Sequence, residues 1–343
     1  MTVAPNEFYD PVRLESRIGA LQGQAVAVKI FLLSIAILIS LHMPHAVAGA
    51  ELPVITVAMV STSWNTNLPV AVARGAGFLK EEGLEVRPVI LSSSGPIMMA
   101  LLMSGQTDLV VAGAVAILRG ISHGAPVVAV SGYLSRISYA LMSAKGLKTV
   151  ADLKGKTIGI TGVGGMGEFT VVEALRRNGL VKDRDFTVLN IEGGPAARMA
   201  ALKSGKVQAV PLTSGQRVQA EKEGYVVLLD TREALPELPS TIVASTRQFA
   251  KANPDKVIKL LKALEKAMEL IRGDKDKAIA LGRSQGLRGD IAVERKALDY
   301  YAQDLDIRLG KENIAALLKQ IDVAEAPQRY FDDAYLTRAL SIR

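Results

Sequence analysis

A segment in the first half of the chain recurs in the second half. Residues Gly95–Val110 hold a Gly-Pro step, an apolar helical stretch and a Ser-Gly step, and Gly194–Val210 repeat this order with one extra residue after Gly-Pro. The matching positions are Met99, Ala100, Leu102, Ser104, Gly105 and Val110 with Met199, Ala200, Leu202, Ser204, Gly205 and Val210. Proline opens helices and glycine closes them in any α/β protein, which is the alternative explanation. We interpret the repeat as two similar lobes, and a cleft between lobes is where ligands bind.

Length and charge limit the class of protein. The 343 residues exceed what one hydrophobic core usually supports, so we expect two domains. Apolar residues make up 49% and aromatic residues 5%, which is typical of a globular protein. The net charge of +7 favours anionic partners. Basic and acidic side chains alternate, as in Glu221–Glu223 and Asp274–Lys277, so we expect a solvated surface and no nucleic-acid partner.

Reactive side chains are scarce. The absence of cysteine excludes disulfides, thiolate zinc sites and cysteine nucleophiles. His42 and His45 lie near the N-terminus, so a processed chain keeps only His123, which cannot form a site with two histidine ligands. His123 follows a predicted helix, where histidine is favoured as a cap. We therefore predict no metal, no cofactor and no enzymatic activity.

The N-terminus predicts export. Ile30–Leu41 form an apolar run after Lys29, and small residues follow. This run is too short to cross a bilayer, which takes about 20 residues. We predict a signal peptide over residues 1–50, cleaved after Ala48 or Ala50, and a periplasmic location. The alternatives are a true start further downstream and an uncleaved membrane anchor, because the leader before Lys29 is long and partly acidic.

Strands and helices alternate along most of the chain. Val54–Val60 is a β-branched run and predicts a strand, and the spacing over Pro69–Leu79 predicts a helix. Such alternation indicates parallel sheets. From Asn253 the pattern turns helical, with a first helix that ends at Gly273 and further helices over roughly Ile291–Leu305 and Lys311–Gln320. The fold class predicted from these patterns is α/β with a helical C-terminal tail.

The tail is expected to pack on the first lobe. Lobe 1 then comprises residues 51–136 plus 241–343, and lobe 2 comprises residues 137–240. The chain would cross between the lobes near Arg136–Ser138 and near Ser240–Ala244.

Several predicted strands end in hydroxyl-bearing turns, where ligands of open α/β sheets bind. These turns hold Ser61, Thr62, Ser63, Ser92, Ser93, Ser94, Thr161, Thr213 and Ser214. Hydroxyl and N–H groups together suit oxyanions and polar head groups, although each serine taken alone is explained better as a helix cap. Trp64 is a candidate wall of the cleft or an ordinary core residue. Arg136 and Arg217 are candidate partners of a ligand carboxylate or sulfonate, or ordinary surface cations.

A glycine loop offers a competing hypothesis. Gly162–Gly167 match G-x-G-x-x-G between a predicted strand and a helix, and Glu192 ends the next strand, as in dinucleotide-binding proteins. Two observations argue against dinucleotide binding. Export would remove the protein from the nucleotide cofactors of the cell, and the loop lies in the second half of the chain instead of after its first strand. Glu192 also immediately precedes the repeated turn at Gly194, which explains its position without a cofactor. We instead expect the loop to face an anion or polar group.

Five stretches together resemble a known family. They are Leu68–Leu84, Met99–Ala112, Val150–Thr161, Val207–Tyr225 and Phe249–Arg272. The chain resembles the solute-binding proteins of ABC importers in the nitrate/sulfonate/taurine and thiamine-precursor-like group. This resemblance implies a type II periplasmic-binding fold with a two-strand hinge. It also implies a monomer that closes on a small polar or anionic solute, such as a sulfonate, nitrate-like, carboxylate or pyrimidine-type molecule, and delivers it to a membrane permease.

The resemblance also implies that the first turns of each lobe contact the ligand. The candidate binding residues are Ser61, Thr62, Ser63, Trp64, Asn65, Ser92, Ser93, Ser94, Gly95, Gly113, Ala114, Gly162, Gly164, Gly165, Met166, Gly167, Gly194, Thr213 and Ser214. The cysteine motif of the pyrimidine-synthesising relatives is absent, so we do not expect their enzymatic activity. A solute sensor for a signalling receptor, or a periplasmic enzyme, are the alternative functions.

Overall fold

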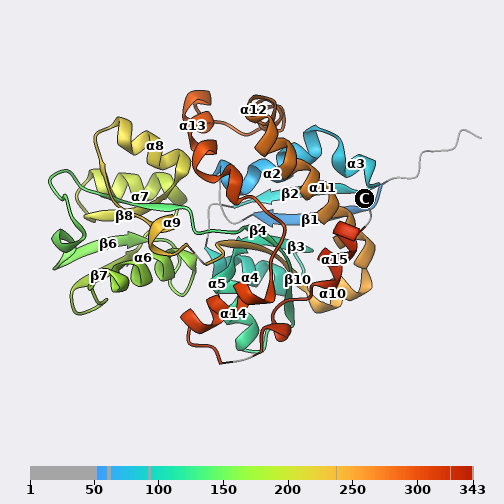
Figure 1. Cartoon of the computed structure of the whole chain (residues 1–343), viewed down its shortest axis with the longest axis horizontal. Coiled ribbons are helices and arrows are strands. Elements are labelled where there is room, and N and C mark those ends of the chain that lie inside the picture. Colours follow the sequence, from blue (N-terminus) through green and yellow to red (C-terminus); the bar gives the residue numbers. More distant parts are fainter. Residues whose placement is uncertain (1–51, 60–62, 92–93, 237, 325, 342–343) are drawn as a thin grey trace, which may run out of the picture. The chain divides into compact units, whose positions relative to one another are not determined.

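The computed structural model describes residues 52–59, 63–91, 94–236, 238–324 and 326–341. The predicted signal peptide and the candidate residues Ser61, Thr62, Ser92 and Ser93 lie outside these ranges. The described residues form two five-stranded sheets, each surrounded by helices (Figure 1).

The first sheet has the strand order β2-β1-β3-β10-β4. β10 runs antiparallel to both of its neighbours, whereas β1 is parallel to β2 and β3. Its strands are β1 (Val54–Met59), β2 (Glu85–Ile90), β3 (Leu109–Gly113), β4 (Val127–Leu134) and β10 (Thr241–Thr246). The helices between these strands are α2 (Trp64–Gly75), α3 (Phe78–Glu81), α4 (Gly95–Met103) and α5 (Ala114–Ser122).

The second sheet has the order β7-β6-β8-β5-β9, with β5 antiparallel to its neighbours. Its strands are β5 (Tyr139–Ser143), β6 (Lys156–Ile160), β7 (Phe186–Asn190), β8 (Ala209–Thr213) and β9 (Val226–Asp230). A short 3-10 turn (Val150–Leu153) precedes β6, and the helices are α6 (Met166–Arg177), α7 (Gly194–Lys203), α8 (Ser214–Lys222) and α9 (Thr231–Ala234).

The repeat occupies the same place in each sheet. α4 connects β2 to β3, and α7 connects the equivalent strands β7 and β8. Each helix has proline in its first turn and a serine at its C-terminal cap. The following glycines, Gly105 and Gly205, have φ angles of 72° and 74°. This left-handed conformation commonly ends helices, and glycine adopts it most easily because it has no side chain. The repeat therefore reflects two units of the same topology.

Helices dominate the C-terminal part of the chain. They are α10 (Arg247–Ala252), α11 (Pro254–Gly273), α12 (Lys275–Ser284), α13 (Ile291–Tyr301), α14 (Lys311–Gln320) and α15 (Ala334–Ser341), with short 3-10 turns at Ala302–Asp304 and Pro327–Arg329. α11 packs against α2 and α15, and α13 packs against α8. Across the described part of the chain, every helix is too short or too polar to span a bilayer.

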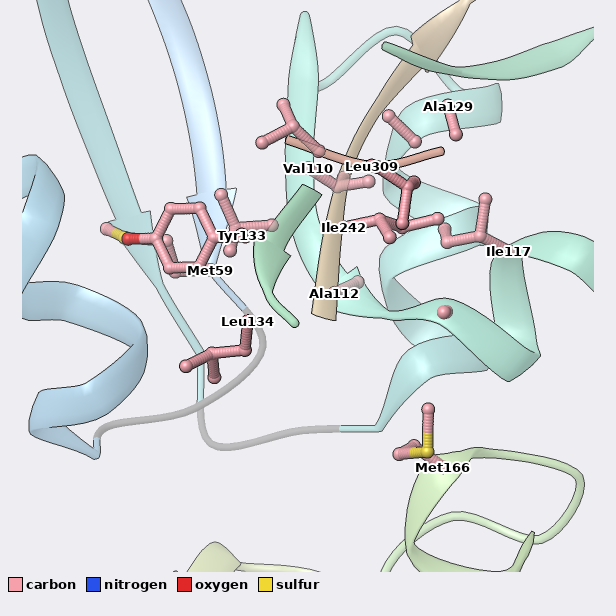
Figure 2. Close-up of a cluster of buried hydrophobic side chains, with 14 of the residues drawn as sticks. Met59, Val110, Ala112, Ile117, Ala129, Tyr133, Leu134, Met166, Ile242 and Leu309 are labelled. Atoms are coloured by element: carbon pink, nitrogen blue, oxygen red, sulfur yellow. The ribbon is translucent and has the colours of Figure 1, made fainter. Parts of the chain in front are cut away.

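The core beside the first sheet is built from continuous apolar strands. Every residue of β3 and β4 is buried, as expected for strands covered on both faces. Figure 2 shows Ile117, Ile242 and Leu309 in this core, contributed by α5, β10 and the segment before α14. Met166 lies at its edge and belongs to α6, a helix between strands of the second sheet.

Two crossovers connect the sheets and lie side by side. The Ser240 N–H donates to the carbonyl of Leu134 at 3.0 Å, immediately before β10 pairs with β4. The buried carboxyl of Asp304 accepts a hydrogen bond of 2.9 Å from Ser138 Oγ, and its backbone oxygen accepts one of 2.8 Å from the Ser135 N–H. The bounds of the two lobes stay a prediction.

One predicted helix has the wrong start. α2 begins at Trp64, whereas the prediction places Pro69 at the first turn. Pro69 lies inside α2, where it removes one backbone donor from the helix. The earlier start makes Trp64, Asn65 and Thr66 the first turn of α2, and this turn reaches the site described below.

Candidate functional site

A cavity of about 90 Å³ lies where strands of both sheets end. Gly113 and Leu134 end β3 and β4 of the first sheet, and Thr213 ends β8 of the second. This is the position at which open α/β sheets bind ligands. The lining residues are Asn65, Thr66, Ser94, Gly95, Gly113, Leu134, Ser138, Tyr139, Thr161, Met166, Gly167, Gly194, Pro195, Arg198, Pro211, Thr213, Ser240 and Thr241.

Part of the predicted site lines this cavity. The predicted residues found there are Asn65, Ser94, Gly95, Gly113, Met166, Gly167, Gly194 and Thr213. The described residues that were predicted but do not line it are Ser63, Trp64, Ala114, Gly162, Gly164, Gly165 and Ser214. Both Gly-Pro turns of the repeat contribute, through Gly95 and through Gly194.

Glycines allow the two units to approach closely. A Cβ added to Gly113 would lie 2.7 Å from Met166 Cβ, and one added to Gly162 would lie 2.4 Å from Ser94 Cβ. Real side chains do not come this close, so any other residue would force the units apart. Gly162 of the loop therefore serves packing against the first unit.

The glycine loop uses its amides internally. The N–H of Gly162 donates to Asn190 Oδ1 at 2.9 Å, and that of Gly164 donates to Glu168 Oε2 at 2.7 Å. The N–H of Gly165 donates to the carbonyl of Gly162 at 3.0 Å. A dinucleotide-binding loop directs such amides at a pyrophosphate. The observed bonds therefore speak against the dinucleotide hypothesis.

A charged network joins this loop to α5. Arg119 Nη1 donates to the carbonyl of Gly164 at 3.0 Å, which links the two units. Glu168 pairs with Lys182 at 2.5 Å. Burial raises the pKa of Glu168, but the hydrogen bonds from Gly164 and Lys182 outweigh it and lower the pKa overall. Glu168 thus remains a carboxylate that holds the loop in shape.

Arg198 places a buried cation in the cavity. It projects from α7, and only 5% of the residue is exposed. Its Nε donates to the carbonyl of Pro211 at 3.1 Å, and its Nη1 donates to Thr161 Oγ1. Within the described ranges, no carboxylate forms an ion pair with it. Burial lowers its pKa, yet a guanidinium keeps its proton in proteins. Glu192 favours the charged form of Arg198 through space but forms no ion pair with it. A buried charge without a direct ion pair is costly, so the site favours an anion.

Arg198 is the charged lining residue that the sequence prediction missed, along with uncharged ones such as Thr66 and Tyr139. The repeat carries a signal for it, because Arg198 occupies the helix position of the fully buried Met98 in the first copy. A cation at a core position of the second unit marks a special environment. The two arginines named instead do not line the cavity: Arg217 pairs with Glu221 and Asp230, and Arg136 lies half-exposed 4.0 Å from Asp304.

Trp64 lies away from the main cavity. It is 5% exposed, and its Nε1 donates to the carbonyl of Arg288 at 2.8 Å. A Cβ on Gly282 of α12 would meet its ring at 3.1 Å, so Trp64 packs on the C-terminal helices. It contributes to a second, smaller cavity.

Known proteins are similar to this chain in sequence. The chain is 27% identical over 229 residues to the 4-amino-5-hydroxymethyl-2-methylpyrimidine phosphate synthase THI13 of Saccharomyces cerevisiae, a match that covers 62% of this chain and 65% of the yeast protein, slightly less than two thirds of its length. It is 25% identical over 245 residues to a putative binding protein of Brucella abortus, covering 69% and 72% of the two chains.

Solved structures show the same architecture. The alkanesulfonate-binding protein SsuA of Xanthomonas axonopodis, bound to MOPS, matches with a TM-score of 0.68 and 22% identity over 85% of this chain and 99% of that one. This similarity confirms the predicted α/β periplasmic-binding fold. The model of the family described as "NMT1/THI5 like" matches residues 64–278. The chain therefore belongs to the NMT1/THI5-like family, which also confirms the predicted resemblance.

Proposed function

We propose that this chain is an exported, monomeric receptor that binds a small anionic solute between its two sheets. It delivers the solute to the membrane permease of an ABC importer. The observation that carries the proposal is Arg198, a buried guanidinium in the cavity that forms no ion pair with any carboxylate in the described part of the chain. The alkanesulfonates after which SsuA of Xanthomonas axonopodis is named are anions of the expected kind.

The other lining groups suit the same role. Hydroxyls of Ser94 and Thr161 and the turn at Gly194 add neutral donors around the guanidinium. Such donors bind an oxyanion by hydrogen bonds. The yeast relatives are named as synthases, but these groups favour binding of an anion over its chemical conversion.

Ligand binding and lobe closure are linked in this proposal. We take residues 51–136 with 241–343 as one lobe and residues 137–240 as the other. A solute that contacts both lobes stabilises the closed state by its higher affinity for that state. The paired crossovers at Leu134 and Ser240 then act as the hinge.

A ligand screen tests this function. The full chain is heated with panels of sulfonates, carboxylates, nitrate and pyrimidines, and hits are measured by calorimetry. A ligand at about 100 times its Kd adds about 2.7 kcal/mol of stability, which raises the melting temperature by several degrees. A response confined to anions supports the proposal. Turnover of a solute, or the absence of any response, overturns it.

Gly113→Ala tests closure. The new Cβ would lie 2.7 Å from Met166 Cβ, so the two units cannot approach as closely. We expect affinity for the solute to fall about tenfold or more, because overpacking costs about 1–3 kcal/mol in the closed state. Gly273→Ala is the matched control, since a Cβ there meets no atom within 4 Å. Equal affinities of the two variants would show that this contact does not limit closure.

A further inference from the structure

A second cavity adjoins the first. Its volume is about 10 Å³, and it shares Asn65 and Thr213 with the main cavity. Its other walls include Trp64 of α2, Gly215 of α8, and Glu294 and Tyr301 of α13. A space of this size holds about one water molecule, or one group of similar size on a ligand.

Glu294 is buried in this second cavity without a partner. The residue is 9% exposed, and none of the described residues gives its carboxyl group a hydrogen bond or an ion pair. Among the side chains that line this cavity, Trp64 donates through Nε1 to the carbonyl of Arg288, and Gln216 accepts a hydrogen bond from Thr213 through Oε1. On α8, Arg217 is committed to Glu221 and Asp230.

Glycines surround this carboxyl group. A Cβ on Gly215 would lie 3.2 Å from Glu294 Oε1, and a Cβ on Gly289 would lie 3.1 Å from the same oxygen. Gly289 has a φ of 156°. Larger residues at these positions would press on the carboxyl oxygens, so the glycines let two separate segments approach Glu294 closely.

Tyr301 adds a second unused polar group. It lies on α13 two turns after Glu294, on the same face of the helix. The residue is 1% exposed, and its buried hydroxyl has no hydrogen-bond partner among the described residues. A hydroxyl and a carboxyl both accept hydrogen bonds, so together they call for a donor.

Leaving these groups unpaired is costly. An unsatisfied buried polar group costs about 1–3 kcal/mol, and more if it is charged. Burial raises the pKa of Glu294 to about 7, and the nearby Asp290 adds to this effect. A donor that enters the cavity would restore the carboxylate and remove the cost.

We propose that Glu294 and Tyr301 form a subsite for an amino or ammonium group of the solute. This inference rests on the proposed function and names the solute class more closely. The solute then carries an anionic group that Arg198 binds and an amino group that lies in the second cavity. Asn65 and Thr213, which line both cavities, lie between the two groups.

Matched solute pairs test the subsite. The full chain is titrated by calorimetry with aminoethanesulfonate and ethanesulfonate, aminopropionate and propionate, and aminoethylphosphonate and ethylphosphonate. For any anion that binds, we expect the amino form to bind about tenfold tighter or more, since a hydrogen bond to a charged group contributes about 1.5–3 kcal/mol. Glu294→Gln should abolish this preference by weakening binding of the amino form. Asp299→Asn, at an exposed carboxyl on the same helix, should keep the preference.

Outcomes separate the two proposals. A preference that survives in Glu294→Gln, or equal binding of both members of a pair, overturns the subsite. A direct probe covers the case in which none of these anions binds: methylammonium chloride should raise the melting temperature of the native chain above that in sodium chloride. The increase should vanish in Glu294→Gln and shrink in Tyr301→Phe. If methylammonium raises the melting temperature but no anion does, the proposed anion receptor is wrong and the subsite is supported. If methylammonium does not raise the melting temperature, the subsite is wrong.

Discussion

Arg198→Met should lower affinity for the anionic solute by about 100-fold or more, while the protein remains folded. The guanidinium is buried in the cavity, so its pairing with the solute takes place away from water. Removing one partner of a buried charge pair costs about 2–5 kcal/mol of binding free energy. Methionine is the residue that the first copy of the repeat carries at this position, as Met98. Calorimetric titration with the best anion of the screen measures the change.

Without ligand, the Arg198→Met variant should be at least as stable as the native chain, although it binds the solute more weakly. Arg198 loses two hydrogen bonds in the variant, to Pro211 and Thr161, but an unpaired buried charge is also removed. Apolar replacements of buried charges are often neutral or stabilising. We therefore expect an unchanged or higher melting temperature together with weak binding.

Two variants sharpen this test. Lys203→Met makes the same change of charge on the same helix, at a half-exposed residue that pairs with Glu223 at 2.6 Å, and should leave binding unchanged. Arg198→Lys keeps the charge but loses the planar fork, so its affinity should be intermediate. Near-native affinity of Arg198→Met, or an equal loss in Lys203→Met, would contradict the role of Arg198.

The architecture was predictable from the sequence because local signals agree with the fold. Gly-Pro and Ser-Gly steps mark the ends of α4 and α7, and apolar runs mark the strands on either side. The repeat made two units of one topology the simplest interpretation. The start of α2 was wrong because Pro69 was placed at its first turn, whereas the helix continues on both sides of this proline.

The cavity was predictable only in part. Glycines and serines at strand ends follow from the fold, so Ser94, Gly113 and Gly194 could be named from the sequence. They line the cavity, and their contact with the solute stays a prediction. Arg198 lies within a helix and looks like any surface cation, and its burial depends on how α7 packs. Its local sequence therefore does not show this burial, and only its alignment with Met98 in the first copy of the repeat indicates it.

The residues of the second cavity could not be predicted from the sequence either. The sequence predicts a helix near Ile291–Leu305, but its spacing does not say which other helix it meets. In the fold α13 packs against α8, which brings Glu294 to Gly215. These residues are far apart in the chain, so their meeting required the structure.

Glu294 should also make the protein less stable as the pH rises. Its pKa is about 7 in the folded chain, against an ordinary value of 4.5. Between these two values the folded state binds more protons than the unfolded chain, so the free energy of unfolding falls as the pH increases through this window. The difference in pKa corresponds to about 3 kcal/mol. Glu294→Gln cannot ionise, so its loss of stability from pH 5 to pH 8 should be smaller by about this amount.

Urea unfolding at several pH values measures this difference. Among the groups near Glu294, only its own carboxyl group is expected to titrate between pH 5 and pH 8. Asp290 has a lowered pKa, Tyr301 has a pKa raised by burial, and Arg217 is paired. Asp299→Asn should show the native pH profile, because its carboxyl group is exposed. An amino-bearing solute at saturation should flatten the native profile, since an ammonium beside Glu294 lowers the pKa of that carboxyl group. Parallel profiles of the native chain and Glu294→Gln would show that this carboxyl group is already satisfied, and would remove the energetic reason for an amino subsite.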